Sequence, residues 1–372
     1  MTDRPKRSLV LAGGGMKVAF QAGVLQVWLD EAGLDFDHVD GASGGTFNLA
    51  LYCMGRSGTQ IADAWRALDP VEGAEVSIGE ILHGDGLLSM DRYRSTVFPS
   101  WGLDWDTIQS SGKEATFNVC HFNDYELMVV TPDRMSEDFL VACAALPMWF
   151  PPVDIDGETY LDAVYLSDGN LEEAIRRGAD EIWVIWTVSE EGAWRPGFVN
   201  TYFQVIEIVA NGNFRRVLER IDRNNAAVAA GRAGEFGRKI DVKVLRGEVP
   251  VNYLLEVGAD RLHEAVERGV EAARAWCAAA GIPLRDPASA QASPVTTAEP
   301  SERVAEGRPG TTGTTAGLTG TSAVATTEPS TLSFTEEMKG FVTAGEIDFQ
   351  EGFRRGQRAA DRLSVRLTIS VD

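Results

Sequence analysis

Hydrophobic and polar positions along the chain alternate between the period of a strand and the period of a helix. Residues 8–12 are an apolar, strand-like run that ends in three glycines, and apolar residues then recur at helical spacing over residues 18–29. The same order returns as a short strand-like segment around Val39, a glycine-rich turn and an apolar helix over residues 47–54. Strands that alternate with helices predict an α/β fold with a largely parallel sheet.

The later part of the pattern predicts more strands and helices of the same fold. Residues 116–120 and 125–130 are typical of two paired strands. Residues 182–188 are a continuous apolar run, which suits a buried central strand. Long helices are predicted over residues 202–220 and 260–280.

The composition changes near residue 283. We assign residues 1–282 to one α/β domain, whereas residues 283–332 are rich in Ala, Ser, Thr, Pro and Gly, which predicts a disordered linker. Residues 333–372 end in a strict alternation of apolar and polar positions, which is typical of a half-buried strand. We therefore expect an incomplete, strand-containing tail of unknown role.

The balance of charge restricts the partners. The chain has 55 acidic and 34 basic residues, a formal net charge of −21, which repels nucleic acids and anionic membrane surfaces. We expect no nucleic-acid partner, and peripheral membrane contact would depend on apolar residues rather than on a polybasic patch. Phe98, Trp101 and Trp105 are compatible with a lid or an interfacial anchor, although burial in the core is the favoured interpretation.

The sequence indicates neither a metal centre nor a membrane span. The four cysteines are widely spaced and form no CxxC pair, so we expect reduced core thiols and no metal or cofactor. No apolar run approaches the roughly 18 residues of a membrane span, and the run after the basic N-terminus is too short for a signal peptide. We expect a cytoplasmic protein and leave its oligomeric state open.

The turn over residues 41–45, GASGG in one-letter code, carries the first candidate for chemistry. It matches G-x-S-x-G, in which small neighbours such as Gly41 and Gly45 allow a serine to occupy a sharp turn between strand and helix. The N-terminus of the following helix favours negative charge that develops beside Ser43. The alternative is an ordinary tight turn.

The glycine run Gly13, Gly14 and Gly15 also joins a predicted strand to a helix. It matches neither nucleotide-binding fingerprint, because Val18 stands where a third spaced glycine would be and no G-x-x-x-x-G-K-S/T occurs. Its backbone N–H groups could face a tetrahedral oxyanion, or the run could be a plain strand-to-helix connection.

A histidine base for Ser43 is poorly supported. The order Ser, Asp, His leaves only His263 downstream of every candidate acid. His263 lies in a charged, helix-like segment that is typical of a solvated surface. A conventional triad is therefore not predicted.

Five segments follow one another over about residues 8–188, namely GGGMK at 13–17, GASGG at 41–45, AALPMWFPPV at 144–153, DGETYLDAV at 156–164 and LEEAIRRGAD at 171–180. In this order they resemble the patatin-like phospholipase family. The resemblance implies a three-layer sandwich, a Ser–Asp dyad and hydrolysis of fatty acyl esters of phospholipids or related lipids.

The resemblance implies that Asp162 is the catalytic acid and that Gly13 to Gly15 form the oxyanion loop. Asp162 would lie at the end of a strand that returns from a hairpin turn at Asp156. Asp168 is the main rival, although it stands where the family has loop residues. Lys17 keeps the family's basic position and is a candidate to bind a phosphate or a carboxylate, or merely to cap a charge on the first helix.

Two departures from the family's pattern leave alternatives open. Ala163 and Val164 follow Asp162 where the family usually has glycine-rich residues, and the glycine loop ends in Lys17 and Val18 rather than in a basic residue and glycine. Val164 is β-branched and disfavours unusual backbone angles. The alternatives are a catalytically silenced lipid- or partner-binding module and an acyltransferase.

Overall fold

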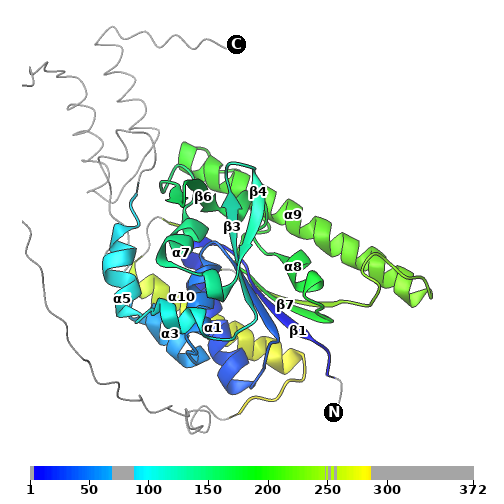
Figure 1. Ribbon diagram of the computed structural model, residues 1–372. Helices are drawn as coiled ribbons and strands as arrows, with labels where there is room; N and C mark the ends of the chain where they lie inside the picture. Colours follow the sequence, from blue (N-terminus) through cyan, green and yellow to red (C-terminus); the bar gives the residue numbers. More distant parts are fainter. Residues whose placement is uncertain (1–3, 69–87, 248, 250–252, 255–257, 286–372) are drawn as a thin grey trace, which may run out of the picture.

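The computed structural model describes residues 4–68, 88–247, 249, 253–254 and 258–285 (Figure 1). Its strands are β1 (Arg7–Leu11), β2 (His38–Ala42), β3 (Ala115–His121), β4 (Glu126–Val130), β5 (Val153–Ile155), β6 (Glu158–Asp162), β7 (Glu181–Trp186) and β8 (Asp241–Arg246). Its α-helices are α1 (Ala19–Leu25), α2 (Gly45–Cys53), α3 (Gly58–Arg66), α5 (Phe98–Ser100), α6 (Trp105–Gln109), α7 (Glu137–Ala144), α8 (Leu171–Arg176), α9 (Phe198–Ala229) and α10 (Ala259–Ala279). Shorter 3-10 turns are η1 (Gly15–Val18), η5 (Pro132–Arg134) and η6 (Ala163–Tyr165), and π-helical turns are η2 (Gln26–Glu31) and η4 (Tyr93–Val97).

The strands form one mixed sheet in the order β5-β6-β3-β2-β1-β7-β8, with β4 also paired to β3. The strands from β3 through β2, β1 and β7 to β8 are parallel to one another, whereas β4, β5 and β6 join by antiparallel pairs. Helices α1, α3 and α10 cover one face, and α8 and α9 cover the other (Figure 1). The predicted α/β three-layer sandwich with a mostly parallel sheet is confirmed.

Both faces of the central strands are buried. Along β1, Leu9 and Leu11 pack into the hydrophobic cluster under α1 and α10, while Val10, and Ala12 directly after the strand, pack into the cluster under α8 and α9. Because each face needs apolar side chains, such a strand is a continuous hydrophobic run rather than an alternating one. This arrangement explains why the sequence signal for β1 and β7 is so strong.

Most of the predicted elements are present with small differences in length. The largest difference is α9, which covers 32 residues instead of the predicted 202–220. Its polar composition weakens the hydrophobic period beyond Arg220, so the sequence pattern ends before the helix does. The tail, and the linker beyond residue 285, lie outside the described residues, and the predicted domain boundaries stay predictions.

The three aromatic residues singled out in the sequence pack against the core. Phe98 and Trp101 are buried, and their rings lie 5.9 and 6.0 Å from the ring of Phe47. Trp105 is partly buried against the same cluster. The favoured prediction of core packing is therefore confirmed.

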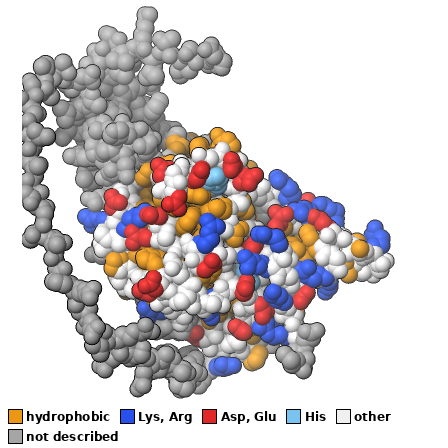
Figure 2. Space-filling view, in the orientation of Figure 1, with side chains coloured by type: hydrophobic (Ala, Val, Ile, Leu, Met, Phe, Trp, Pro, Cys, Tyr) orange, Lys and Arg blue, Asp and Glu red, His pale blue; other side chains and the backbone are white. Residues whose placement is uncertain are grey.

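The surface mixes charges of both signs. Figure 2 shows acidic and basic side chains interspersed on one face, with apolar side chains gathered near the upper part of the molecule. Among the helices that the structure describes, none combines the length and the hydrophobicity that crossing a bilayer requires.

Candidate active site

Ser43 lies in the turn between β2 and α2. Its backbone has a φ of 47°, which is uncommon for a residue other than glycine. The Ser43 carbonyl accepts hydrogen bonds from the Thr46 backbone N–H at 3.0 Å and from the Thr46 hydroxyl at 2.5 Å. The turn therefore holds Ser43 in a strained conformation that directs its side chain away from the strand.

The glycines beside Ser43 allow close backbone contacts. A Cβ on Gly45 would lie 2.3 Å from the carbonyl oxygen of Leu11 in β1. A Cβ on Gly41 would lie 3.1 Å from the Leu49 side chain, which is a tighter than usual but less severe contact. Gly45 thus lets the first turn of α2 approach the end of β1, and a larger residue would displace Ser43.

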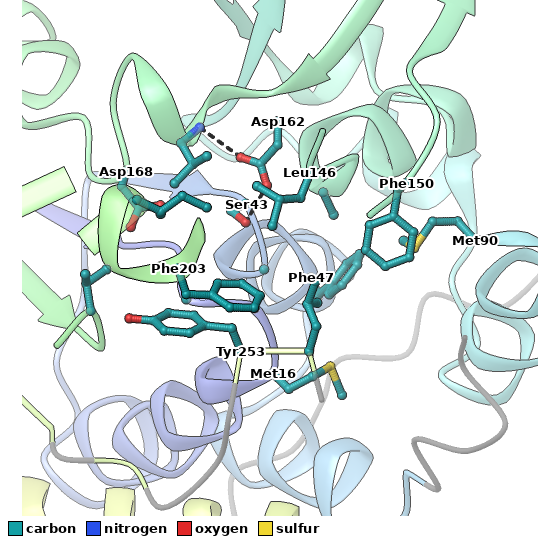
Figure 3. A pocket seen from close by; sticks show the side chains of 18 of the residues that line it. Met16, Ser43, Phe47, Met90, Leu146, Phe150, Asp162, Asp168, Phe203 and Tyr253 are labelled. Carbon is teal, nitrogen blue, oxygen red and sulfur yellow. Dashed lines mark hydrogen bonds between the residues drawn. The ribbon is translucent and has the colours of Figure 1, made fainter. Parts of the chain in front are cut away.

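The hydroxyl of Ser43 donates a hydrogen bond to Oδ2 of Asp162 at 2.6 Å (Figure 3). The other carboxylate oxygen, Oδ1, accepts from the backbone N–H of Val164 at 2.9 Å. Asp162 is 1% exposed and Ser43 is 8% exposed. Both oxygens of the buried carboxylate are therefore paired, and one of them faces the serine.

Strand β3 brings Ser43 and Asp162 together, although 119 positions separate them in the sequence. Ala42, the last residue of β2, pairs with Asn118 of β3. Asp162, the last residue of β6, pairs with Val119, which directly follows Asn118 in β3. Because β4 pairs with β3 at both positions on the opposite edge, β2 and β6 meet end to end along one edge of β3. The ends of the two strands place the hydroxyl beside the carboxylate.

Burial changes the acidity of Asp162. Desolvation raises its pKa to about 7, against the opposing effects of the hydrogen bonds from Ser43 and Val164. A carboxyl group with such a pKa exchanges its proton near neutral pH, which is the property of a general acid or base.

Val164 departs from the family pattern without distorting the site. It belongs to η6, which begins directly after Asp162, and the described residues with positive φ do not include it. Its backbone N–H binds Asp162, and its side chain lines the cavity of Ser43. A β-branched residue is therefore accommodated at this position.

The glycine loop requires a correction at Gly13. Its backbone N–H donates to the carbonyl oxygen of Asp168 at 2.9 Å, so it is already used within the protein. In the part of the chain that the structure describes, the N–H groups of Gly14 and Gly15 have no acceptor. The same is true of Gly44, which the sequence analysis did not propose as a donor.

An apolar cavity opens over Ser43 and Asp162 (Figure 3). The loop residues Gly14 and Gly15 contribute to its wall. Most of the remaining lining is apolar and comes from distant parts of the sequence, including Met16, Phe47, Met90, Leu146, Phe150 and Phe203. The sequence motifs indicate the chemical groups but not this lining, because the lining residues share no local motif.

The described histidines do not line this cavity. His263 lies on α10 and is exposed, as its charged sequence context predicted. His38 is buried between Ser8 and Thr116, and burial lowers its pKa to about 3. Neither side chain is placed to assist Ser43.

A comparison with protein-family models gives a match to the patatin-like phospholipase family over residues 9–175. The match covers slightly less than half of the 372-residue chain. The matched range includes Ser43, Asp162 and the glycine loop.

Two individual proteins are similar to this chain. The uncharacterized protein YjjU of Escherichia coli strain K12 is 26% identical over 200 residues, which cover 51% of this chain and 54% of YjjU. The chain thus spans about half the length of this relative. The crystal structure of VipD from Legionella pneumophila aligns with a TM-score of 0.40 and 15% identity, over 74% of this chain and 67% of VipD.

Within the range that matches the family model, Lys17 faces a second, polar pocket. Its Nζ donates to the Ser189 hydroxyl at 3.0 Å and lies 3.9 Å from the ring centre of Tyr253. Burial lowers the pKa of Lys17 to about 8, and the negative charge of Glu207 partly opposes this shift. Phe203 and Tyr253 line both the polar pocket and the cavity of Ser43, so the two spaces are neighbours.

The hairpin predicted before Asp162 is present. Asp156 and Gly157 have φ values of 55° and 86°, which are typical of the tight turn that joins β5 to β6. Asp168, the rival acid, also lines the cavity of Ser43, but the Ser43 hydroxyl donates to Asp162.

Proposed function

We propose that this chain is a serine lipid acyl hydrolase that cleaves fatty acyl esters of phospholipids or related lipids. Ser43 is the nucleophile and Asp162 is its base in this proposal. The supporting observation is the 2.6 Å hydrogen bond from the Ser43 hydroxyl to a buried carboxylate at an apolar cavity. A pKa of about 7 for Asp162 supports the role of base at neutral pH.

In the first half of the reaction, the Asp162 carboxylate accepts the proton of the Ser43 hydroxyl while Oγ attacks the ester carbonyl carbon. The carbonyl oxygen becomes an oxyanion, to which the free N–H groups of Gly14, Gly15 and Gly44 donate. The oxyanion then collapses, the ester C–O bond breaks and the proton on Asp162 passes to the leaving alcohol. The acyl group remains on Ser43.

In the second half, Asp162 takes a proton from water as the water oxygen attacks the acyl-enzyme carbonyl. The bond to Ser43 Oγ breaks, the serine regains the proton from Asp162 and the fatty acid leaves. Each proton that Asp162 accepts is returned within the same half-reaction. This sequence needs no metal or cofactor.

The two neighbouring pockets support a substrate with an apolar and an anionic part. The cavity over Ser43 would hold the acyl chain. Lys17, Arg195 and Arg215 lie in the polar pocket, where they would attract a phosphate, although Glu190, Glu191 and Glu207 also line this pocket. We propose that Lys17 contributes to binding the anionic headgroup. Apolar side chains, rather than a polybasic patch, would make any peripheral contact with a lipid surface.

A panel of lipids in mixed micelles tests this substrate class. We expect release of free fatty acid from an anionic phospholipid, and we expect Lys17→Met to raise KM for that lipid about tenfold without changing KM for an uncharged diacylglycerol. Lys239→Met, at an exposed lysine, is the matched control and should change neither value. Equal changes for both lipids would contradict the role of Lys17, and an acylated acceptor instead of free fatty acid would indicate transfer rather than hydrolysis.

A further inference from the structure

Asp168 has a buried carboxyl oxygen without a hydrogen-bond partner. The residue follows η6 and precedes α8, and its side chain is 3% exposed. Its Oδ1 has no partner within the described residues, although the side chain lines the cavity that contains Ser43. An unpaired oxygen in such a place costs free energy unless a ligand or substrate completes its hydrogen bond.

Gly13 places this oxygen beside the nucleophile. A Cβ on Gly13 would lie 1.9 Å from Asp168 Oδ1 and 2.9 Å from Ser43 Cβ. The carboxyl group and the serine side chain therefore approach the same side of Gly13, in the space that its missing side chain leaves. Figure 3 shows Asp168 and Asp162 at the same end of the cavity as Ser43.

The two carboxyl groups at the cavity have different environments. Asp162 receives hydrogen bonds from Ser43 and Val164, which stabilise its ionised form. Burial, and next the negative charge of Asp162, raise the pKa of Asp168 well above its usual range, while the Gly13 N–H opposes the shift. When two nearby carboxyl groups differ in this way, one serves as the base and the other keeps its proton.

We propose that the protonated carboxyl group of Asp168 is a further catalytic group that donates a hydrogen bond to the carbonyl oxygen of the bound ester. The bond strengthens as Ser43 attacks and that oxygen becomes negative, so Asp168 acts together with the N–H groups of Gly14 and Gly15. The proton stays on Asp168 throughout, and Asp162 alone transfers protons. This inference rests on the proposed hydrolase function.

A matched pair of substitutions tests the donor role. Asn has the size of Asp and retains a donor, whereas Leu is of similar size and has none. We expect kcat of Asp168→Asn to remain within about threefold of the wild type, and kcat of Asp168→Leu to fall about 100-fold with KM little changed. A Leu variant as fast as the wild type, or an Asn variant as slow as the Leu variant, would overturn the proposal.

Protonation of Asp168 can be tested without any turnover. A carboxyl group that stays protonated when folded but ionises near pH 4 when unfolded makes the folded state less stable as pH rises toward its folded pKa. Chemical unfolding from pH 5 to pH 8 should therefore show that the stability advantage of Asp168→Asn over the wild type grows with pH. A constant difference would overturn the proposal. Absence of Ser43-dependent turnover in the wild type would instead contradict the hydrolase function, and the unfolding comparison would still decide the state of Asp168.

Discussion

Ser43→Ala is expected to abolish ester turnover while the protein stays folded. No other group of the proposed mechanism can form the acyl-enzyme, so kcat should fall by more than about 10⁴-fold. The substitution removes one hydroxyl and keeps the small size that the turn requires. Release of fatty acid, measured beside a thermal unfolding curve, checks both parts of the expectation.

Ser110→Ala is the matched control for this experiment. Ser110 is exposed at the end of α6, so its substitution should leave kcat unchanged. Substantial turnover by a folded Ser43→Ala protein would mean that the nucleophile is another group.

Asp162→Asn is expected to cause the second largest fall in kcat. The amide keeps the shape of the carboxylate but cannot accept the Ser43 proton, so kcat should fall about 10²- to 10⁴-fold. In the wild type, kcat/KM should rise with pH through about 7, because Asp162 must be ionised to act as the base and burial raises its pKa to that value. The variant should lose this rise, which steady-state rates from pH 5 to pH 9 will detect.

Asp133→Asn, at an exposed position in η5, is the control and should keep the wild-type pH profile. Full turnover in Asp162→Asn together with a large loss in Asp168→Asn would assign the role of base to Asp168. Turnover of the same two variants therefore distinguishes Asp162 from Asp168 as the base.

The local patterns of the sequence predicted the parts of the fold that depend on neighbouring residues. The apolar runs of β1 and β7 are strong because both faces of these strands are buried, and the glycines around Ser43 are those that a sharp turn requires. Helix α3 is not among the predicted elements, although Ser57 and Gln60 form a capping box at its start, which is a signal that the sequence itself contains.

The arrangement of the site depends on contacts between distant segments. The meeting of Ser43 with Asp162 follows from the pairing of both β2 and β6 with β3, which no local pattern specifies. The use of the Gly13 N–H by Asp168 is likewise a contact across 155 positions, and it moves the free donors of the loop to Gly14 and Gly15. Lys17 was identified from its place after the glycines, but its separate pocket depends on residues of α9.

The central claim, that Ser43 is an activated nucleophile, is tested most directly by reaction with a fluorophosphonate followed by mass spectrometry of the peptides. The account predicts one covalent adduct on the peptide that contains Ser43, slower labelling in Asp162→Asn and no adduct in Ser43→Ala. Folded wild-type protein that stays unlabelled, or that carries the adduct at another residue, would contradict it.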